Sequence, residues 1–155
     1  MNPFAGEMQI MQTILVTGSN GFVGRNLCET LSRIQDLTLY RYDIDSDSNN
    51  LDKALEAADI IFHLAGVNRP TSVEGFQTGN SELTYTICRK LVALDRSPKV
   101  ILSSSIQAEL DNPYGASKRA AEEHVRAYCA ETGADGVVYR LKNLFGKWCR
   151  PNYNS

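Results

Sequence analysis

The sequence predicts an α/β fold, a doubly wound parallel sheet of the Rossmann type with about five or six strands and helices on both faces. Short, β-branched apolar runs alternate along the chain with longer segments in which apolar residues recur every three or four positions. The first apolar run ends at a glycine-rich turn that opens one of these amphipathic segments. The 155 residues, 43% of them hydrophobic, are enough for a single core.

The first strand and helix form the clearest unit. Residues 13–16 are β-branched and apolar and are followed by a turn with glycine, which predicts a strand over 12–17 that is buried on both faces. A helix is predicted over 22–34, because its apolar residues fall on one face. These residues are Phe22, Val23, Leu27, Leu31 and Ile34.

The same alternation continues as far as residue 141. Further strands are expected at 37–42, 60–64, 100–102 and 137–141, and further helices at 51–58, 78–94 and 114–131. Strands that are joined through helices pair in parallel, by right-handed crossovers.

Composition excludes several classes of partner. The net charge of −2 gives no general attraction to nucleic acid or to an anionic membrane, and no apolar run is long enough to span a bilayer. Residues 1–12 lack the features of a secretion signal. The four cysteines are scattered without the spacing of a zinc site, so we expect reduced thiols, no metal and a cytoplasmic protein.

The glycine-rich turn over 17–24 predicts a dinucleotide site. Gly18 permits the tight turn, Gly21 lets main chain approach a pyrophosphate, and Gly24 lets helix and strand come close. The N-terminus of the helix adds free N–H groups and a positive dipole end. The expected cofactor contacts in this turn are Gly18, Asn20, Gly21, Phe22, Val23, Gly24 and Arg25.

Asp43 bears on the choice of cofactor. It ends the second strand nineteen positions after Gly24, close to the spacing of about twenty at which a carboxylate binds the adenosine ribose. Its charge favours NAD, because it opposes a 2′-phosphate. Arg25 and Arg41 could each hold that phosphate instead, so NAD and NADP both remain open.

Tyr114 and Lys118 predict proton transfer. They are four residues apart in a predicted helix and therefore share a face. A phenol with an ordinary pKa of about 10 cycles poorly at neutral pH, but a neighbouring ammonium stabilises the tyrosinate and can also bind a ribose. The serines 103–105 follow an apolar strand, at the carboxyl edge of the sheet where ligands bind, and a hydroxyl there can orient a carbonyl. These features point to a nicotinamide-dependent oxidoreductase.

These motifs resemble the extended short-chain dehydrogenase/reductase superfamily, which includes the NAD-dependent epimerases and dehydratases. Residues 59–66, Asn80, and Arg140 with 143–146 extend the likeness over the chain from Thr13 onward. A closer likeness is to the CapF/WbjC family of bacterial capsule and O-antigen enzymes. It is visible at 63–70, 102–108, 111–115 and 143–155.

The resemblance implies a role for each matching residue. Tyr114 is the general acid, Lys118 is its partner and a ribose ligand, and Ser105, with Ser104 as second choice, orients the carbonyl. The remaining matches are Leu64, Ala65 and Gly66 against the cofactor, Arg69 at a substrate phosphate or in a surface salt bridge, and Asn143 at substrate or nicotinamide.

The resemblance also implies the reaction. Members of the closer family reduce the C4 ketone of a UDP-2-acetamido-2,6-dideoxy-hexos-4-ulose with NADPH and carry a C-terminal cupin domain. We therefore expect an N-terminal extension at 1–12, an NAD(P)-binding Rossmann domain at 13–142 and the start of a truncated substrate-binding region at 143–155. A homodimer through the helices 78–94 and 114–131 is also expected.

Two other functions remain open. An NAD-dependent nucleotide-sugar 4-epimerase or dehydratase would use the same tyrosine, lysine and serine, and Asp43 favours it. A non-catalytic nucleotide-binding module is the other alternative. His63, within an apolar strand, is expected to be a core histidine whose hydrogen bonds are satisfied.

Overall fold

The protein is built on a single parallel sheet. The computed structural model describes residues 11–66 and 77–149, with main chain only for 77–79. Its five strands lie in the order β2-β1-β3-β4-β5, and all neighbours are parallel. The strands are β1 (Gln12–Thr17), β2 (Leu37–Tyr42), β3 (Ile60–His63), β4 (Lys99–Ser105) and β5 (Gly136–Leu141).

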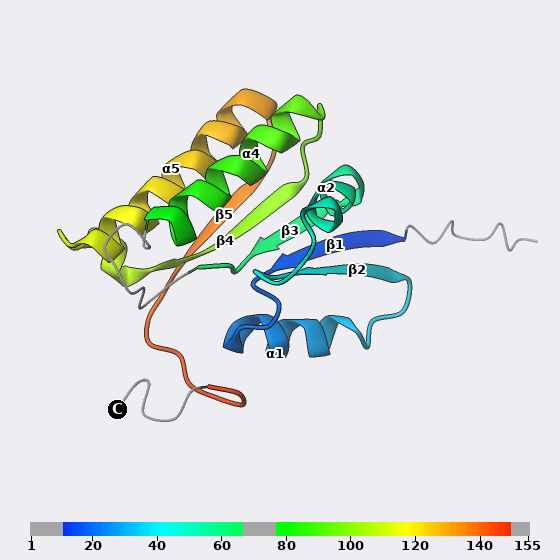
Figure 1. Ribbon diagram of the computed structural model, residues 1–155, viewed down its shortest axis with the longest axis horizontal. Helices are drawn as coiled ribbons and strands as arrows, with labels where there is room; N and C mark the ends of the chain where they lie inside the picture. The colour runs from blue at the N-terminus through cyan, green and yellow to red at the C-terminus, as the bar shows by residue number, and fades with distance from the viewer. Residues whose placement is uncertain (1–10, 67–76, 150–155) are drawn as a thin grey trace, which may run out of the picture.

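Helices cover both faces of this sheet, as Figure 1 shows. After β1 the chain moves to β2 on one side, whereas every later strand is added on the other side. Right-handed crossovers in opposite directions place the connecting helices on opposite faces. Thus α1 (Phe22–Leu31) lies on one face, and α2 (Ser48–Ala57), α4 (Leu83–Ala93) and α5 (Pro113–Thr132) lie on the other. The predicted doubly wound fold is confirmed.

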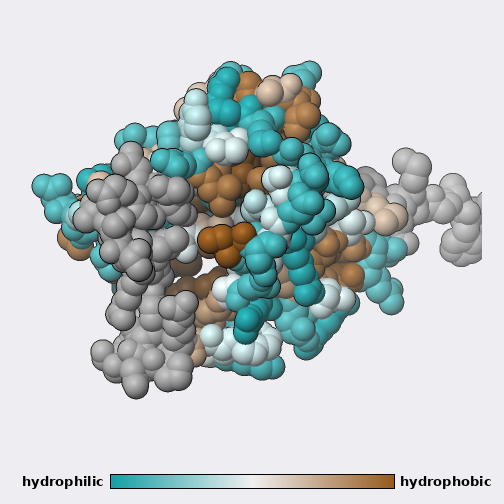
Figure 2. All heavy atoms as spheres, viewed as in Figure 1, coloured by the Kyte–Doolittle hydropathy of each residue, from teal (hydrophilic) through white to brown (hydrophobic). Residues whose placement is uncertain are grey.

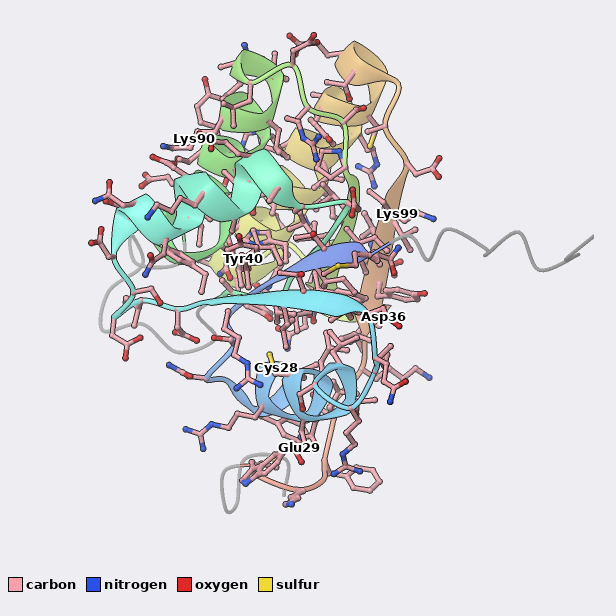
Figure 3. All side chains as sticks on the ribbon, turned by 90° about the vertical axis from the view of Figure 1, so that its right-hand side faces the viewer. Cys28, Glu29, Asp36, Tyr40, Lys90 and Lys99 are labelled. Atoms are coloured by element: carbon pink, nitrogen blue, oxygen red, sulfur yellow. The ribbon has the colours of Figure 1, made fainter. Side chains whose placement is uncertain are left out.

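Two hydrophobic clusters hold the layers together. On the α1 side, Ile14 and Val16 of β1 pack with Cys28 and Leu31 of the helix. The larger cluster on the other side joins β1, β3 and β4 to the remaining helices. Figure 3 views the sheet from β2 and shows Cys28 on the α1 side and Tyr40 on the α2 side. Figure 2 shows that apolar residues reach the surface near the middle of this face, with polar residues beside them.

Several element boundaries differ from those predicted. The expected strand 100–102 extends over 99–105, because its serines continue to pair with β5. The helix expected over 51–58 begins at Ser48, where the Asp47 side chain accepts the Asn49 N–H. The helix expected over 78–94 begins as a π-helical turn (Gln77–Glu82), and a 3-10 turn (Ile106–Glu109) that was not predicted follows β4.

Candidate active site at the carboxyl edge of the sheet

The turn between β1 and α1 brings main chain to the point where the strand order reverses. Gly18 has a φ of +68°, and a β-carbon there would lie 2.6 Å from the nitrogen of Ala65. A β-carbon on Gly24 would overlap the carbonyl oxygen of Gly18. Within the described residues, no side chain caps the start of α1. The turn is therefore suited to an anion such as a pyrophosphate.

Asp43 follows β2 and lies beside this turn. Its Oδ2 atom accepts the N–H of Asn20 at 2.7 Å, and its Oδ1 atom accepts the N–H of Ile44 at 2.8 Å. The end of β2 and the glycine turn, which the spacing of Gly24 and Asp43 predicted to be neighbours, are therefore in contact in the structure. The carboxylate also has a structural task, because it holds the glycine turn in place.

The main chain after β3 separates the glycine turn from the helix α5. Leu64 packs on the α1 side of the sheet, and the Ala65 nitrogen adjoins Gly18. A β-carbon on Gly66 would lie 2.6 Å from Oδ1 of Asn80 and 2.9 Å from Nζ of Lys118. Gly66 thus lies directly against the ends of the Asn80 and Lys118 side chains, and a larger residue would require both of them to move.

Tyr114 and Lys118 lie in the first turns of α5. Asn112 caps this helix by accepting the Gly115 N–H at 2.7 Å. The Lys118 ammonium is 5.7 Å from the centre of the Tyr114 ring and donates to the Ser103 carbonyl at 3.4 Å. Lys118 is only 7% exposed, and this burial lowers its pKa to about 8. A buried cation next to a phenol stabilises the deprotonated phenol.

The serines of β4 point in alternate directions. Ser104 is buried, and its hydroxyl donates to Oε1 of Glu122 at 2.6 Å. Ser105 is half-buried and accepts the Gln107 N–H at 3.2 Å. A hydroxyl that accepts one hydrogen bond can still donate its own proton. Of the two serines predicted to orient a carbonyl, Ser105 has the hydroxyl that is better placed to do so.

The sequence pattern of the NAD dependent epimerase/dehydratase family matches residues 14–155. The chain belongs to this family. The family likeness that the sequence motifs suggested is therefore confirmed.

Individual relatives of the family are also similar over most of the chain. UDP-2-acetamido-2,6-beta-L-arabino-hexul-4-ose reductase of Pseudomonas aeruginosa is 50% identical over 142 residues, 92% of this chain. The crystal structure of the capsular polysaccharide assembling protein CapF from Staphylococcus aureus is 44% identical over 92% of this chain, with a TM-score of 0.78. The chain spans 38% of the length of each of these two proteins.

A third relative was solved with a nucleotide sugar and a nicotinamide dinucleotide bound. MoeE5, in complex with UDP-glucuronic acid and NAD, is 25% identical, with a TM-score of 0.73 over 90% of this chain and 57% of its own. The family description and this complex support a nicotinamide dinucleotide as the cofactor class.

For this member of the family, sequence reasoning missed a charge network around a buried carboxylate behind the site. Glu122 is fully buried one turn after Lys118. Its two oxygens accept from Ser104, from Arg126 at 3.0 Å and from Arg140 at 2.9 and 2.8 Å. The network fixes α5 against β4 and β5. A carboxylate on the same helical face as Lys118 and the apolar residues was the signal that could have revealed it.

Of the two residues expected to contact substrate, Arg69 and Asn143, the structure describes only Asn143. Arg69 lies outside the described residues. Asn143 follows β5 and is exposed. The segment that it begins turns back toward α1, where Nδ2 of Asn26 donates to the Lys147 carbonyl at 2.9 Å.

The described residues offer neither a cluster suited to a metal ion nor a helix suited to a membrane. Within residues 11–66 and 77–149, no group of three or more histidine, cysteine or acidic side chains is arranged to hold a metal ion. Among the helices in the same ranges, none is both long enough and apolar enough to cross a membrane.

Proposed function

We propose that this chain is the cofactor-binding and proton-transfer part of an NAD(P)-dependent nucleotide-sugar 4-keto reductase. The buried Lys118 ammonium beside Tyr114, across Gly66 from the glycine turn, is the observation that carries the proposal. The name of the reductase that is 50% identical supports a UDP-2-acetamido-2,6-dideoxy-hexos-4-ulose as substrate. The likeness to the capsular polysaccharide assembling protein CapF supports a place in the synthesis of capsule sugars.

Residues of this chain would transfer the proton that the reduction requires. The glycine turn would hold NAD(P)H, which when bound would supply hydride to the C4 carbon of the sugar. The Tyr114 phenol gives its proton to the developing alkoxide, and Lys118 stabilises the tyrosinate that results. Ser105 donates a hydrogen bond that orients the carbonyl oxygen. Residues 13–142 act as the cofactor domain, and 143–155 begin the region that meets the sugar.

The proposal favours NADPH over NADH. Both oxygens of Asp43 already accept main-chain N–H groups, so part of its charge is taken up within the protein. Arg41 is exposed and lies opposite Val16, whose side chain faces α1. Arg41 therefore lies on the α1 side of the sheet, the side that also carries the exposed Arg25. Two guanidinium groups there suit a 2′-phosphate.

Titrating the protein separately with NADPH and with NAD tests the proposal. Selective binding of NADPH supports a reductase. Tightly retained NAD would favour the 4-epimerase or dehydratase, to which Asp43 gives some support, and binding of neither would leave a nucleotide-binding module. In a full-length version, Tyr114→Phe is expected to abolish turnover while cofactor still binds. Unchanged turnover would remove Tyr114 from the mechanism.

The proposal includes a cytoplasmic homodimer. All four cysteines are free thiols, which agrees with a reducing compartment. The α4 and α5 pair has an exposed tyrosine, Tyr85, whose ring centre lies 5.2 Å from that of His124. Such an aromatic group on two adjacent helices suits burial against a second copy. Sedimentation that detects only monomer would reject the dimer.

A further inference from the structure

His63 is buried beneath the site and uses both of its ring nitrogens. It is the last residue of β3 and is 1% exposed. Its Nδ1 atom lies 2.6 Å from the hydroxyl of Thr17 at the end of β1. Its Nε2 atom lies 2.8 Å from the hydroxyl of Thr84 on α4. The imidazole thus connects the strand before the glycine turn to a helix on the other side of β3.

Each threonine hydroxyl also forms a hydrogen bond with a main-chain group. The Thr17 hydroxyl accepts the N–H of Ala65 at 3.3 Å, and the Thr84 hydroxyl donates to the carbonyl of Asn80 at 2.7 Å. An amide N–H can only donate and a carbonyl can only accept. The Asn80 carbonyl takes the only proton of the Thr84 hydroxyl and so fixes the direction at that end, whereas the Thr17 hydroxyl, which accepts from Ala65, can still donate its own proton.

The direction determines the tautomer of His63. Thr84 gives its single proton to Asn80, so Nε2 of the histidine must be the donor toward Thr84. Nδ1 of the neutral ring is then an acceptor, and it receives the proton of Thr17. Burial, and secondly the charge of Lys118, lower the pKa of His63 to about 3, so the ring stays neutral.

Both ends of this series of hydrogen bonds, at Ala65 and at Asn80, lie in the proposed site. Ala65 and Gly66 form the main chain between the glycine turn and Lys118. Asn80 reaches α5, because its Nδ2 atom donates to the Ser117 hydroxyl at 3.2 Å. A shift at one end would therefore be transmitted to the other.

We propose that His63 is a positioning residue that sets the Ala65–Gly66 main chain relative to the helix bearing Lys118. It does so as the neutral Nε2-protonated tautomer, within a chain of hydrogen bonds that runs in one direction from the Ala65 N–H to the Asn80 carbonyl. The inference rests on the proposed function, because that function places Ala65 and Gly66 against the cofactor.

Nitrogen-15 NMR of the chain tests the tautomer. We expect a protonated Nε2 and an unprotonated Nδ1 for His63, both unchanged from about pH 5 to about pH 8. Thr84→Val removes the acceptor for Nε2, whereas Thr84→Ser keeps it. Hydrogen exchange at the Ala65 amide should become faster in the valine variant and return to the wild-type rate in the serine variant. The Kd for NADPH should rise about tenfold in the valine variant only.

Tyr128→Phe is the matched control. Tyr128 is also buried and lies on α5, but its hydroxyl donates at 2.8 Å to the Pro98 carbonyl, before β4 begins and so at the opposite edge of the sheet. This variant should lose stability without a specific effect on the Ala65 amide or on NADPH binding.

Three results would overturn the inference: a protonated Nδ1, a ring that titrates in that pH range, or equal effects of Thr84→Val and Tyr128→Phe. If the wild type binds neither NADPH nor NADH, the proposed function fails. The tautomer of His63 and the exchange of the Ala65 amide would still decide the inference.

Discussion

Replacing Lys118 with methionine is expected to stabilise the protein while removing the proposed chemistry. Burial lowers the pKa of Lys118 from 10.5 to about 8. At about 1.4 kcal/mol per pKa unit, the charged side chain costs the folded state about 3 kcal/mol near neutral pH. Methionine is of similar length and uncharged, but it loses the hydrogen bond to Ser103, worth about 1 kcal/mol. A net gain of about 2 kcal/mol in the free energy of unfolding remains.

The gain should depend on pH in a defined direction. Because the folded pKa lies below the unfolded one, the unfolded chain holds the extra proton between about pH 8 and pH 10.5. Wild-type stability therefore benefits as the pH rises through this window, and the advantage of the methionine variant shrinks. Near neutral pH we expect its melting temperature to be higher by about 6 °C.

Circular dichroism melts at several pH values measure this effect. Lys53→Met, at an exposed position on α2, is the control and should change stability by less than about 0.5 kcal/mol. Lys118→Met should also lose turnover in a full-length version. A variant no more stable than wild type near neutral pH, or a gain that stays constant up to pH 10.5, would refute the reasoning.

Two further substitutions test the charges around the site. Glu122→Gln should destabilise the fold by about 2 kcal/mol, measured as a lower urea midpoint, because it removes the charge of a fully buried carboxylate that accepts hydrogen bonds from the partly exposed Arg140. Glu29→Gln, at an exposed ion pair, should leave the midpoint nearly unchanged, and equal shifts would contradict a special role for Glu122. Arg41→Ser should raise the Kd for NADPH about tenfold and leave that for NADH unaltered. Parallel weakening of both cofactors would show that Arg41 does not bind the 2′-phosphate.

The fold was predictable because its signals are local. Apolar periodicity within each segment located the strands, and the glycine turn located the start of α1. The prediction failed where a polar side chain takes part in a tertiary contact. Ser104 reads as the end of a strand, yet β4 continues through it, because its main chain pairs with β5 and its hydroxyl meets Glu122.

The candidate site was predictable only in part, for a related reason. The relation of Tyr114 to Lys118 is fixed by the helical repeat and could be derived from spacing. The bond between Glu122 and Arg140 joins residues 18 apart in the chain, and the bond between Thr17 and His63 joins residues 46 apart. No local pattern states which distant partner such a side chain will meet.

The close approach of Gly18 and Ala65 has a consequence for how cofactor preference can change among relatives. The surface between these residues is main chain, and a β-carbon on Gly18 would displace it. If the turn holds a dinucleotide as proposed, substitution would act on the adenosine end through side chains at the margin, such as Arg25, Arg41 and Asp43. A change of preference between the two nicotinamide dinucleotides would need few mutations, and none of them would alter the surroundings of Lys118.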